Sequence, residues 1–316
     1  MDPAEPGGAG VHHTRLHVMG STAEVTVVGG RSRHLDLAER RLADLDRLWS
    51  RFRPTSDVSR LNLAEGFPVP VATETLCLVD HLVAAWRATA GAFDPTLLPA
   101  LVAAGDVASR DDPEARTTLP PSASWPGDPG GIETDHARGL ARLPLGTAID
   151  AGGLGKGLAA DLTVIELLAA GADGALVSVG GDLRVEGVAP QGAWSIAVED
   201  PRDPTALGPV LALAAGGVAT STPAARRWRA GGVDRHHLFS PATGAPADVP
   251  VASVTVAAAT AAWAEALTKV PFVRGAQAGV AILQDMDVAA LVVSRDGARQ
   301  TTAAWSRLGR HRGESA

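Results

Sequence analysis

The stretch that most constrains the fold is a glycine-rich turn at 149–161, which reads IDAGGLGKGLAAD. Glycines beside a lysine at the start of a helix are typical of phosphate-binding loops, because open backbone N–H groups and the helix dipole attract anions. A P-loop would need glycine at Asp150 and a hydroxyl residue at Gly157, and a dinucleotide fingerprint from Gly153 would need glycine at Leu158. The spacing therefore fits neither motif, and the stretch is either a structural turn or another kind of phosphate loop.

Apolar periodicity along the chain predicts helices and strands that do not alternate strictly. Apolar residues at helical spacing and short apolar runs are the two signals. Strands mixed irregularly with helices are typical of α+β proteins, so we expect mixed sheets with packed helices. The expected helices cover 35–52, 74–89, 158–170 and 260–273, and the expected strands cover 23–28, 175–179, 194–199, 209–214, 253–258 and 289–294.

The 316-residue chain is long enough for one large domain or two closely packed ones. We expect the main domain to span 16–306. Residues 1–15 are predicted to be a disordered N-terminus, and the polar tail at 307–316 is predicted to fray. Residues 106–135 are rich in Pro, Asp, Ser and Gly without periodicity, which predicts a long exposed loop insertion.

Composition excludes several classes of function. The net charge is −7 and the basic residues are scattered, whereas nucleic-acid binding needs clustered positive charge. Cys77 is the only cysteine, which excludes an internal disulfide and a cysteine-based metal site. No apolar run approaches the roughly 20 residues of a membrane span, and the N-terminus lacks the pattern of a secretory signal. We therefore expect a soluble cytoplasmic protein without membrane insertion.

Two further clusters carry polar groups in loops. GAFDPT at 91–96 offers Asp94 and Thr96 for hydrogen bonding, although Asp-Pro before Thr is also an ordinary turn. RHHLFSPATG at 235–244 contains neighbouring histidines, which titrate near neutral pH and could include a general base. Adjacent histidines on a loop are also commonly just solvated. Both alternatives stay open at each cluster.

A last cluster, AEALTK at 264–269, places polar groups on one face of an expected helix. Thr268 and Lys269 follow Glu265 by three and four positions, which is the spacing of neighbours on a helix surface. The alternative is a surface Glu–Lys pair, which is common and contributes little stability.

Taken in this order, the clusters resemble the ApbE-type flavin transferases, which are FAD:protein FMN transferases. The resemblance extends from 19 to about 275 and depends on eight short motifs in the family's order. In this chain they read MGS (19–21), RPTSDVSRLN (53–62), GAFDPT (91–96), DAGGLGKGLAAD (150–161), VSVGGD (177–182), TST (220–222), HLFSPATG (237–244) and EALTK (265–269).

This resemblance implies an α+β fold with an FAD cleft between two subdomains, and a Mg²⁺-dependent transfer. FMN would move from FAD to a Thr or Ser hydroxyl of a target protein, and AMP would be released. The acceptor would be an electron-transfer subunit or an FMN-binding domain, in some cases attached to a membrane. If water attacks instead, the same site is an FAD pyrophosphatase, and a non-catalytic FAD-binding protein is the third possibility.

The resemblance also implies roles for individual residues. His237 matches the proposed general base. The metal would be held by the Gly153 carbonyl and by the late helix, where the matching positions give Glu265 and Thr268. The residues that match FAD contacts of the family are Met19, Phe52, Ala92, Phe93, Asp94, Asp150, Lys156 and Leu238.

The chain departs from the family pattern at the metal helix and beside the base. Glu265 replaces an aspartate, and Lys269 replaces the common threonine. Ser240 replaces an aspartate after the histidine, which removes a carboxylate that could orient the base. We therefore predict altered metal binding, through either a weaker affinity or partial replacement of the metal by the lysine ammonium.

Overall fold

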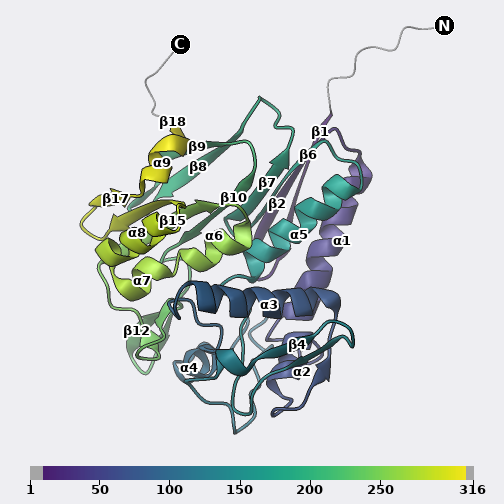
Figure 1. Ribbon diagram of the computed structural model, residues 1–316, viewed down its shortest axis with the longest axis vertical. Coiled ribbons are helices and arrows are strands. Elements are labelled where there is room, and N and C mark those ends of the chain that lie inside the picture. Colours follow the sequence, from purple (N-terminus) through teal and green to yellow (C-terminus); the bar gives the residue numbers. More distant parts are fainter. Residues whose placement is uncertain (1–9, 311–316) are drawn as a thin grey trace, which may run out of the picture.

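A computed structural model of the chain describes residues 10–310, and for 204–207 and 309–310 it describes the backbone alone. Its centre is an eight-stranded sheet in which all neighbouring strands are antiparallel (Figure 1). The strands follow in the order β1 (Val11–Val18), β2 (Ser21–Val28), β6 (Gly174–Val179), β7 (Asp182–Gly187), β10 (Gly216–Ser221), β15 (Val251–Ala258), β16 (Ala289–Ser294) and β17 (Arg299–Thr301).

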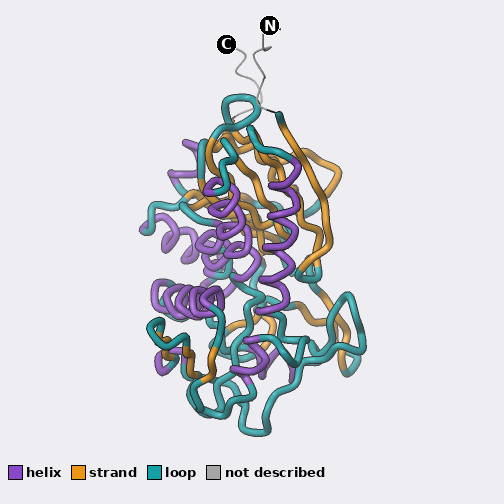
Figure 2. Tube along the Cα trace, turned by 90° about the vertical axis from the view of Figure 1, so that its right-hand side faces the viewer, coloured by secondary structure: helices purple, strands orange, loops and turns teal. Residues whose placement is uncertain are grey.

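Both faces of this sheet are covered, which explains why several strands read as unbroken apolar runs. In β16, Ala290 and Val292 pack on one side while Leu291 and Val293 pack on the other, as successive strand residues must. Figure 2 shows the helices gathered on one side of the strands. The helices on this side are α1 (Ser32–Trp49), α5 (Gly155–Ala169), α6 (Ala261–Leu267), α7 (Val270–Arg274) and α8 (Ala276–Asp285).

The opposite face packs against a smaller antiparallel sheet and α9 (Ala303–Leu308). Trp194, Ile196 and Val198 alternate with exposed residues along one of its strands and enter the core between the sheets. The small sheet contains β8 (Trp194–Asp200), β9 (Asp203–Leu213) and β18 (Gly309–Arg310), in the order β18-β9-β8.

A second, loop-rich part lies beyond one end of the large sheet, with α3 (Thr73–Ala88) between the two parts (Figure 1). Most of 106–135 consists here of turns and irregular loop. The short elements of this part are α2 (Asp57–Asn62), α4 (Leu98–Ala103), the 3₁₀ turn η1 (Pro129–Gly131), and the sheet of β3 (Val69–Pro70), β5 (Leu140–Arg142) and β4 (Glu133–Asp135). Two hairpins complete the described elements, β11 (Arg227–Ala230) with β12 (Val233–His236) and β13 (Phe239–Ser240) with β14 (Ala245–Pro246).

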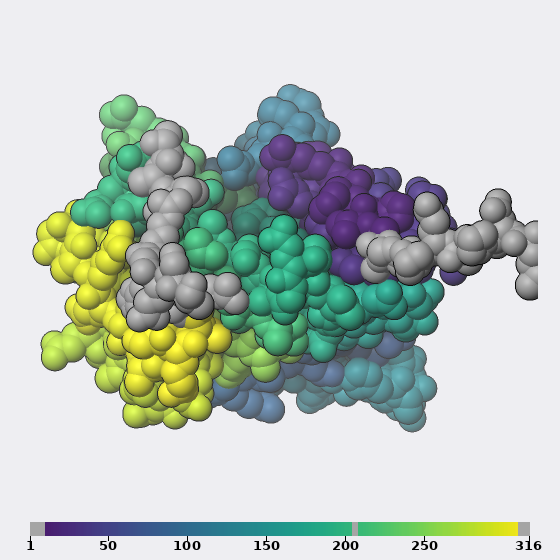
Figure 3. All heavy atoms as spheres, turned by 90° about the horizontal axis from the view of Figure 1, so that it is seen from above, coloured from purple at the N-terminus to yellow at the C-terminus, as the bar shows by residue number. Residues whose placement is uncertain are grey.

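The expectations for the two chain ends are wrong where the structure describes them. Residues 11–15 are not disordered but belong to β1, which pairs with β2 along its full length. Residues 307–310 are not frayed, because they end α9 and form β18. Residues 1–9 and 311–316 lie outside the described part. Seen from above in Figure 3, the purple N-terminal residues and the yellow C-terminal residues lie on opposite sides of the view, consistent with β1 and β17 being the two edges of the large sheet.

The expected helix at 260–273 is wrong as a single helix, because it breaks into α6 and α7. Pro271 stands in the first turn of α7, where its ring and missing N–H prevent a continuous helix. Thr268 ends α6 and Lys269 begins α7, so the lysine lies at the junction.

Close packing of α5 against the start of α6 depends on two residues of the glycine-rich stretch. A Cβ added to Gly157 would stand 2.5 Å from the carbonyl carbon of Ala261 and 2.7 Å from the nitrogen of Ala262. The buried Asp161 accepts hydrogen bonds from the N–H groups of the same two alanines, both at 2.9 Å. Gly157 therefore serves helix packing, and Asp161 caps α6.

We expect Gly157→Ala to separate α5 from α6 and to lower the free energy of unfolding by about 2–3 kcal/mol, since the added methyl meets backbone that cannot move alone. Urea denaturation measures this difference. Gly192→Ala is the matched control: its Cβ would meet no atom within 4 Å at φ +84°. It should cost about 1 kcal/mol of left-handed backbone strain. Equal losses in the two variants would contradict the packing role of Gly157.

Candidate functional site

The glycine-rich loop enters α5 under the control of a carboxylate from another helix. Gly157 is the third residue of α5, and its N–H donates to Oε2 of Glu265 at 2.8 Å. The N-terminal residue of the helix has no side-chain cap of its own, so Glu265 from α6 satisfies one of the free N–H groups. Glu265 is 1% exposed, and its carboxylate thus joins the loop to the late helix inside the protein.

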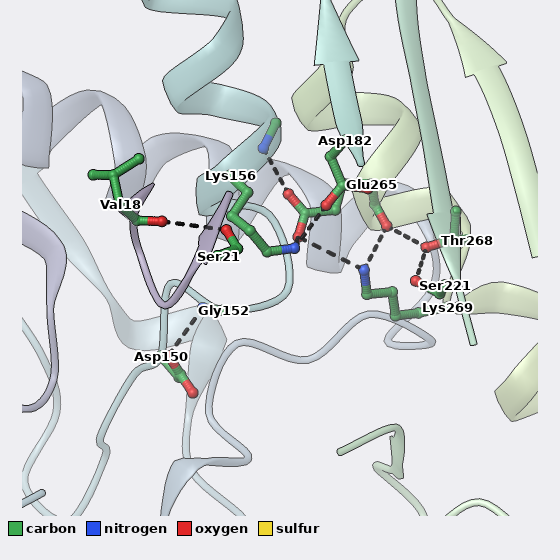
Figure 4. A network of polar contacts seen from close by, with 11 residues as sticks. Val18, Ser21, Asp150, Gly152, Lys156, Asp182, Ser221, Glu265, Thr268 and Lys269 are labelled. Carbon is green, nitrogen blue, oxygen red and sulfur yellow. Dashed lines mark hydrogen bonds and ion pairs between the residues drawn. The ribbon is translucent and has the colours of Figure 1, made fainter. Parts of the chain in front are cut away.

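The Glu265 carboxylate belongs to a cluster of four charged groups, as Figure 4 shows. The other three are Asp182, Lys156 and Lys269. Lys156 Nζ lies 2.7 Å from Oδ2 of Asp182 and 3.5 Å from Oε1 of Glu265. Lys269 Nζ donates to the backbone carbonyl of Glu265 at 2.8 Å and lies 3.9 Å from Oε1. The acids are buried and the lysines are partly exposed, so the positive groups are the accessible side of the cluster.

Burial and pairing shift the pKa values within this cluster in different directions. Burial raises the pKa of Glu265, against the influence of the neighbouring Lys156. Burial also acts to lower the pKa of Lys156, but Asp182 and Glu265 outweigh it, and the pKa of this lysine is raised. Burial lowers the pKa of Lys269, which lacks a partner as close as Asp182. Lys156 is thus the firmly charged member of the pair.

Two tight turns bring Met19 to the same region. Met19 and Gly20 form a two-residue hairpin with φ +53° and +66°, the conformation of a type I′ turn. A Cβ on Gly180, in the turn before β7, would stand 3.0 Å from Ser21 Oγ and 3.3 Å from Lys156 Cδ. The Met19 turn therefore lies beside the stem of Lys156.

The GAFDPT segment at 91–96 packs against the glycine-rich loop. Ala92 and Phe93 are buried, and Cε2 of the phenylalanine lies 2.9 Å from the point where a Cβ on Gly153 would stand. The carboxylate of Asp94 accepts hydrogen bonds from the N–H and hydroxyl of Thr96, at 2.8 and 2.7 Å. Phe93 therefore packs against the loop.

A buried ion network extends from Asp150, and sequence reasoning missed it. Arg51, whose side chain is 3% exposed, lies 3.6 Å from Asp150 Oδ2 and donates to Asp106 Oδ2 at 2.9 Å. Arg226 donates to the other oxygen of Asp106 at 2.5 Å. The guanidinium of Arg51 also lies over the ring of Phe52, 4.7 Å from its centre. The one signal in the sequence was an arginine, Arg51, between the last apolar residues of the stripe at 35–52, where a charge needs a partner.

His237 is oriented by a backbone carbonyl in place of the missing carboxylate. Its Nδ1 lies 3.3 Å from the carbonyl oxygen of Arg226. A carbonyl only accepts, so Nδ1 carries the hydrogen and Nε2 keeps its lone pair. Burial, together with the charge of Lys269, lowers the pKa of His237 to about 3. The imidazole is therefore neutral over the physiological range, as a general base must be. Leu238 beside it is buried.

Two of the three predicted metal ligands, Glu265 and Thr268, already have hydrogen-bond partners within the protein. Thr268 is fully buried; its hydroxyl donates to the Glu265 carbonyl at 2.6 Å and shares a hydrogen bond with Ser221. The Glu265 carboxylate is already paired as described, and within residues 10–310 no group of three His, Cys, Asp or Glu residues could hold a metal. A divalent ion about 4 Å from one ammonium group would be repelled by roughly 8 kcal/mol at an effective dielectric constant of 20, which cancels the attraction of one carboxylate at the same distance. The donor set of this chain does not fit Mg²⁺.

Two cavities lie around the β11–β12 hairpin. One of about 450 Å³ is lined by residues that include Trp125, Arg235 and Gly244, and one of about 220 Å³ includes Asp106 and Arg226. Neither is lined by the residues that match FAD contacts. The expected FAD cleft between subdomains stays a prediction.

The lowered pKa of His237 makes the stability of the protein depend on pH. Below pH 6.5 the unfolded chain binds a proton at this residue, whereas the folded chain does so only near pH 3. The stability gained from the neutral imidazole is complete above pH 6.5 and is lost as the pH falls toward 3. Between pH 7 and 5 the native chain should lose more free energy of unfolding than His237→Gln, by at most about 1.4 kcal/mol per pH unit.

Urea denaturation at each pH measures this difference. His136→Gln, at an exposed position, controls for the removal of an imidazole as such. Parallel pH dependences in the native chain and His237→Gln would contradict the shift.

The sequence of this chain is similar to a family of known proteins. The sequence matches the model of the ApbE family over residues 19–292. The FAD:protein FMN transferase of Vibrio cholerae is 27% identical over 263 residues, which are 81% of this chain and 77% of that protein. The enzyme of the same name from Haemophilus influenzae is 25% identical over 264 residues, with 80% and 76% covered.

Solved structures agree in fold over nearly the whole length. The ApbE protein of Thermotoga maritima superposes with a TM-score of 0.83 at 26% identity, covering 96% of this chain and 100% of that one. The apo form of the flavinyl transferase ApbE from Pseudomonas stutzeri gives 0.79 at 28% identity, with 96% and 98% covered. The expected α+β fold is thus confirmed, and this chain belongs to the ApbE family.

Proposed function

We propose that the protein is an FAD:protein FMN transferase, which moves FMN from FAD to a hydroxyl of a target protein. The observation that carries the proposal is a neutral histidine with a fixed tautomer whose pKa is lowered in part by the charges of two lysines, Lys269 and Lys156. His237 can accept a proton at Nε2, while Lys156 and Lys269 can hold an anion. The relatives that match most of the chain are transferases of this name.

The chemistry follows from these groups. Nε2 of His237 would remove the proton from a Thr or Ser hydroxyl of the acceptor, and that oxygen would bond to the phosphorus of the FMN half of FAD. The bond between this phosphorus and the bridging oxygen breaks, and AMP leaves with the electron pair. The ammonium groups of Lys156 and Lys269 would stabilise the negative charge of the pyrophosphate as it shifts to AMP.

Other predicted contacts with FAD remain part of the proposal. The turn that contains Met19 leads into Ser21, near the stem of Lys156, and Asp150 stands beside Arg51, next to Phe52. Within residues 10–310, Nη1 of Arg51 is buried and has no hydrogen-bond partner, which supports a ligand atom at this place. Ala92, Phe93, Asp94 and Leu238 would line or support the same cleft.

The acceptor we propose is an electron-transfer subunit or an FMN-binding domain with a short Thr- or Ser-containing motif. Within residues 10–310, no helix combines the length and apolarity needed to cross a membrane. The cytoplasmic location stays a prediction, which fractionation of the native cells would test.

The test is incubation of the protein with FAD, Mg²⁺ and an acceptor domain that carries such a motif. We expect a fluorescent covalent band on the acceptor and one AMP for each flavin transferred. AMP without the band would replace transfer by pyrophosphate hydrolysis, and bound FAD with neither product would leave only a binding protein.

His237→Gln should lower the rate of transfer by about 10²- to 10⁴-fold, because the general base is lost, and should leave FAD affinity nearly unchanged. Single-turnover kinetics and FAD fluorescence quenching measure the two quantities. His136→Gln is the matched control, since it removes an exposed imidazole from the same chain. A His237→Gln variant with the native rate would remove this residue from the mechanism.

A further inference from the structure

Both lysines of this protein stand at the same carboxylate. The chain has 28 basic residues, of which only Lys156 and Lys269 are lysines and all others are arginines. In a chain that otherwise uses arginine for positive charge, both lysines contact Glu265. An ammonium group is a compact, strongly hydrated point charge, whereas a guanidinium is a broad planar fork. The site therefore selects the cation whose size and charge density are closest to those of a metal ion.

The side chain of Lys269 contacts both parts of the expected metal site. Its Nζ donates to the Glu265 carbonyl at 2.8 Å, and its Cε lies 3.8 Å from the point where a Cβ on Gly153 would stand. The break between α6 and α7 puts Lys269 at this place, since Pro271 ends the helix there. The lysine thus lies between the late helix and the glycine loop, where the resemblance places the cation.

The positive charge is already balanced without a metal. Lys156 and Lys269 face Glu265 and Asp182, so the four groups carry two charges of each sign. The hydroxyl of Thr268 points to Ser221 and to the Glu265 carbonyl, which removes it as a further oxygen ligand. Each oxygen of Glu265 and the hydroxyl of Thr268 thus already has a partner, while a partly exposed ammonium is available to an anion.

We propose that the ammonium group of Lys269 takes the place of the divalent cation in this protein, so that two lysines bind the pyrophosphate of FAD without a resident metal. This inference rests on the proposed function for the identity of the ligand. It assigns Lys269 a direct contact with a phosphate oxygen on the side of the cluster opposite Lys156.

The first experiment compares FAD affinity in EDTA and in Mg²⁺ by fluorescence quenching, for the native chain and for Lys269→Thr. The native chain should bind FAD equally in the two buffers. Lys269→Thr should lose roughly tenfold or more of its affinity in EDTA, because a charge-assisted hydrogen bond to phosphate is removed. A tenfold loss by the native chain in EDTA, or native affinity of Lys269→Thr in EDTA, would overturn the proposal.

Arg87→Thr is the matched control, since it removes one positive charge from an exposed position on α3. It should bind FAD as the native chain does, which separates a local contact from the general effect of net charge. Thermal unfolding of all three proteins verifies that each is folded under the conditions of the binding experiment.

The second experiment uses no flavin, so it separates this inference from the proposed function. Mn²⁺ is titrated into the ligand-free protein and the free ion is followed by electron paramagnetic resonance. The native chain should leave Mn²⁺ free at equimolar concentrations, and stoichiometric binding would overturn the inference. If the native chain binds no FAD in either buffer, the proposed function fails, whereas the Mn²⁺ result still decides whether a metal occupies this site.

Discussion

The arrangement of the site depends on one buried carboxylate, that of Glu265. A carboxylate inside a protein is costly unless its oxygens are paired, and here the partners come from two places in the chain. Lys156 and Gly157 belong to the first turn of α5, and Lys269 stands at the junction of α6 and α7. Displacing either of these segments would expose or unpair the charge, so the loop and the late helix hold each other in place.

A second network positions His237, and it is built from long-range contacts. Asp106 joins Arg51 and Arg226, and the carbonyl of Arg226 orients His237. The ion pairs span 55 and 120 positions of sequence. The loop that contains Asp106 was expected to be an insertion, but its first residue connects the two halves of the candidate site.

Sequence alone predicted those elements whose pattern has a single physical cause. The run AALVVS at 289–294 is a strand because both of its faces are buried, and the structure gives the same bounds. β1 was missed because it is an edge strand with polar residues on both faces, including His12 and Thr14 on the less exposed one, which hides the period of two. The helix expected at 260–273 was wrong because apolar spacing continues through Pro271, whereas the backbone cannot.

The sequence predicted which charged residues belong to the candidate site, but it did not predict their hydrogen-bond partners. Lys156 lies beside Glu265, and the Gly153 turn lies beside Lys269. The hydroxyl of Thr268 is engaged by Ser221 and by the Glu265 carbonyl. The loss of an acid at Ser240 suggested an unoriented base, yet a backbone carbonyl orients His237. Backbone acceptors carry no signature in the sequence, because every residue has one.

The convergence of the two lysines has a practical chemical consequence. Their side chains are the only amines of the protein apart from the chain terminus, and both are partly exposed. Burial lowers the pKa of Lys269, which leaves more of its amine unprotonated and nucleophilic. Amine-selective reagents that label most proteins over their whole surface would here modify the charge cluster, and any anion bound between the lysines would shield both from labelling.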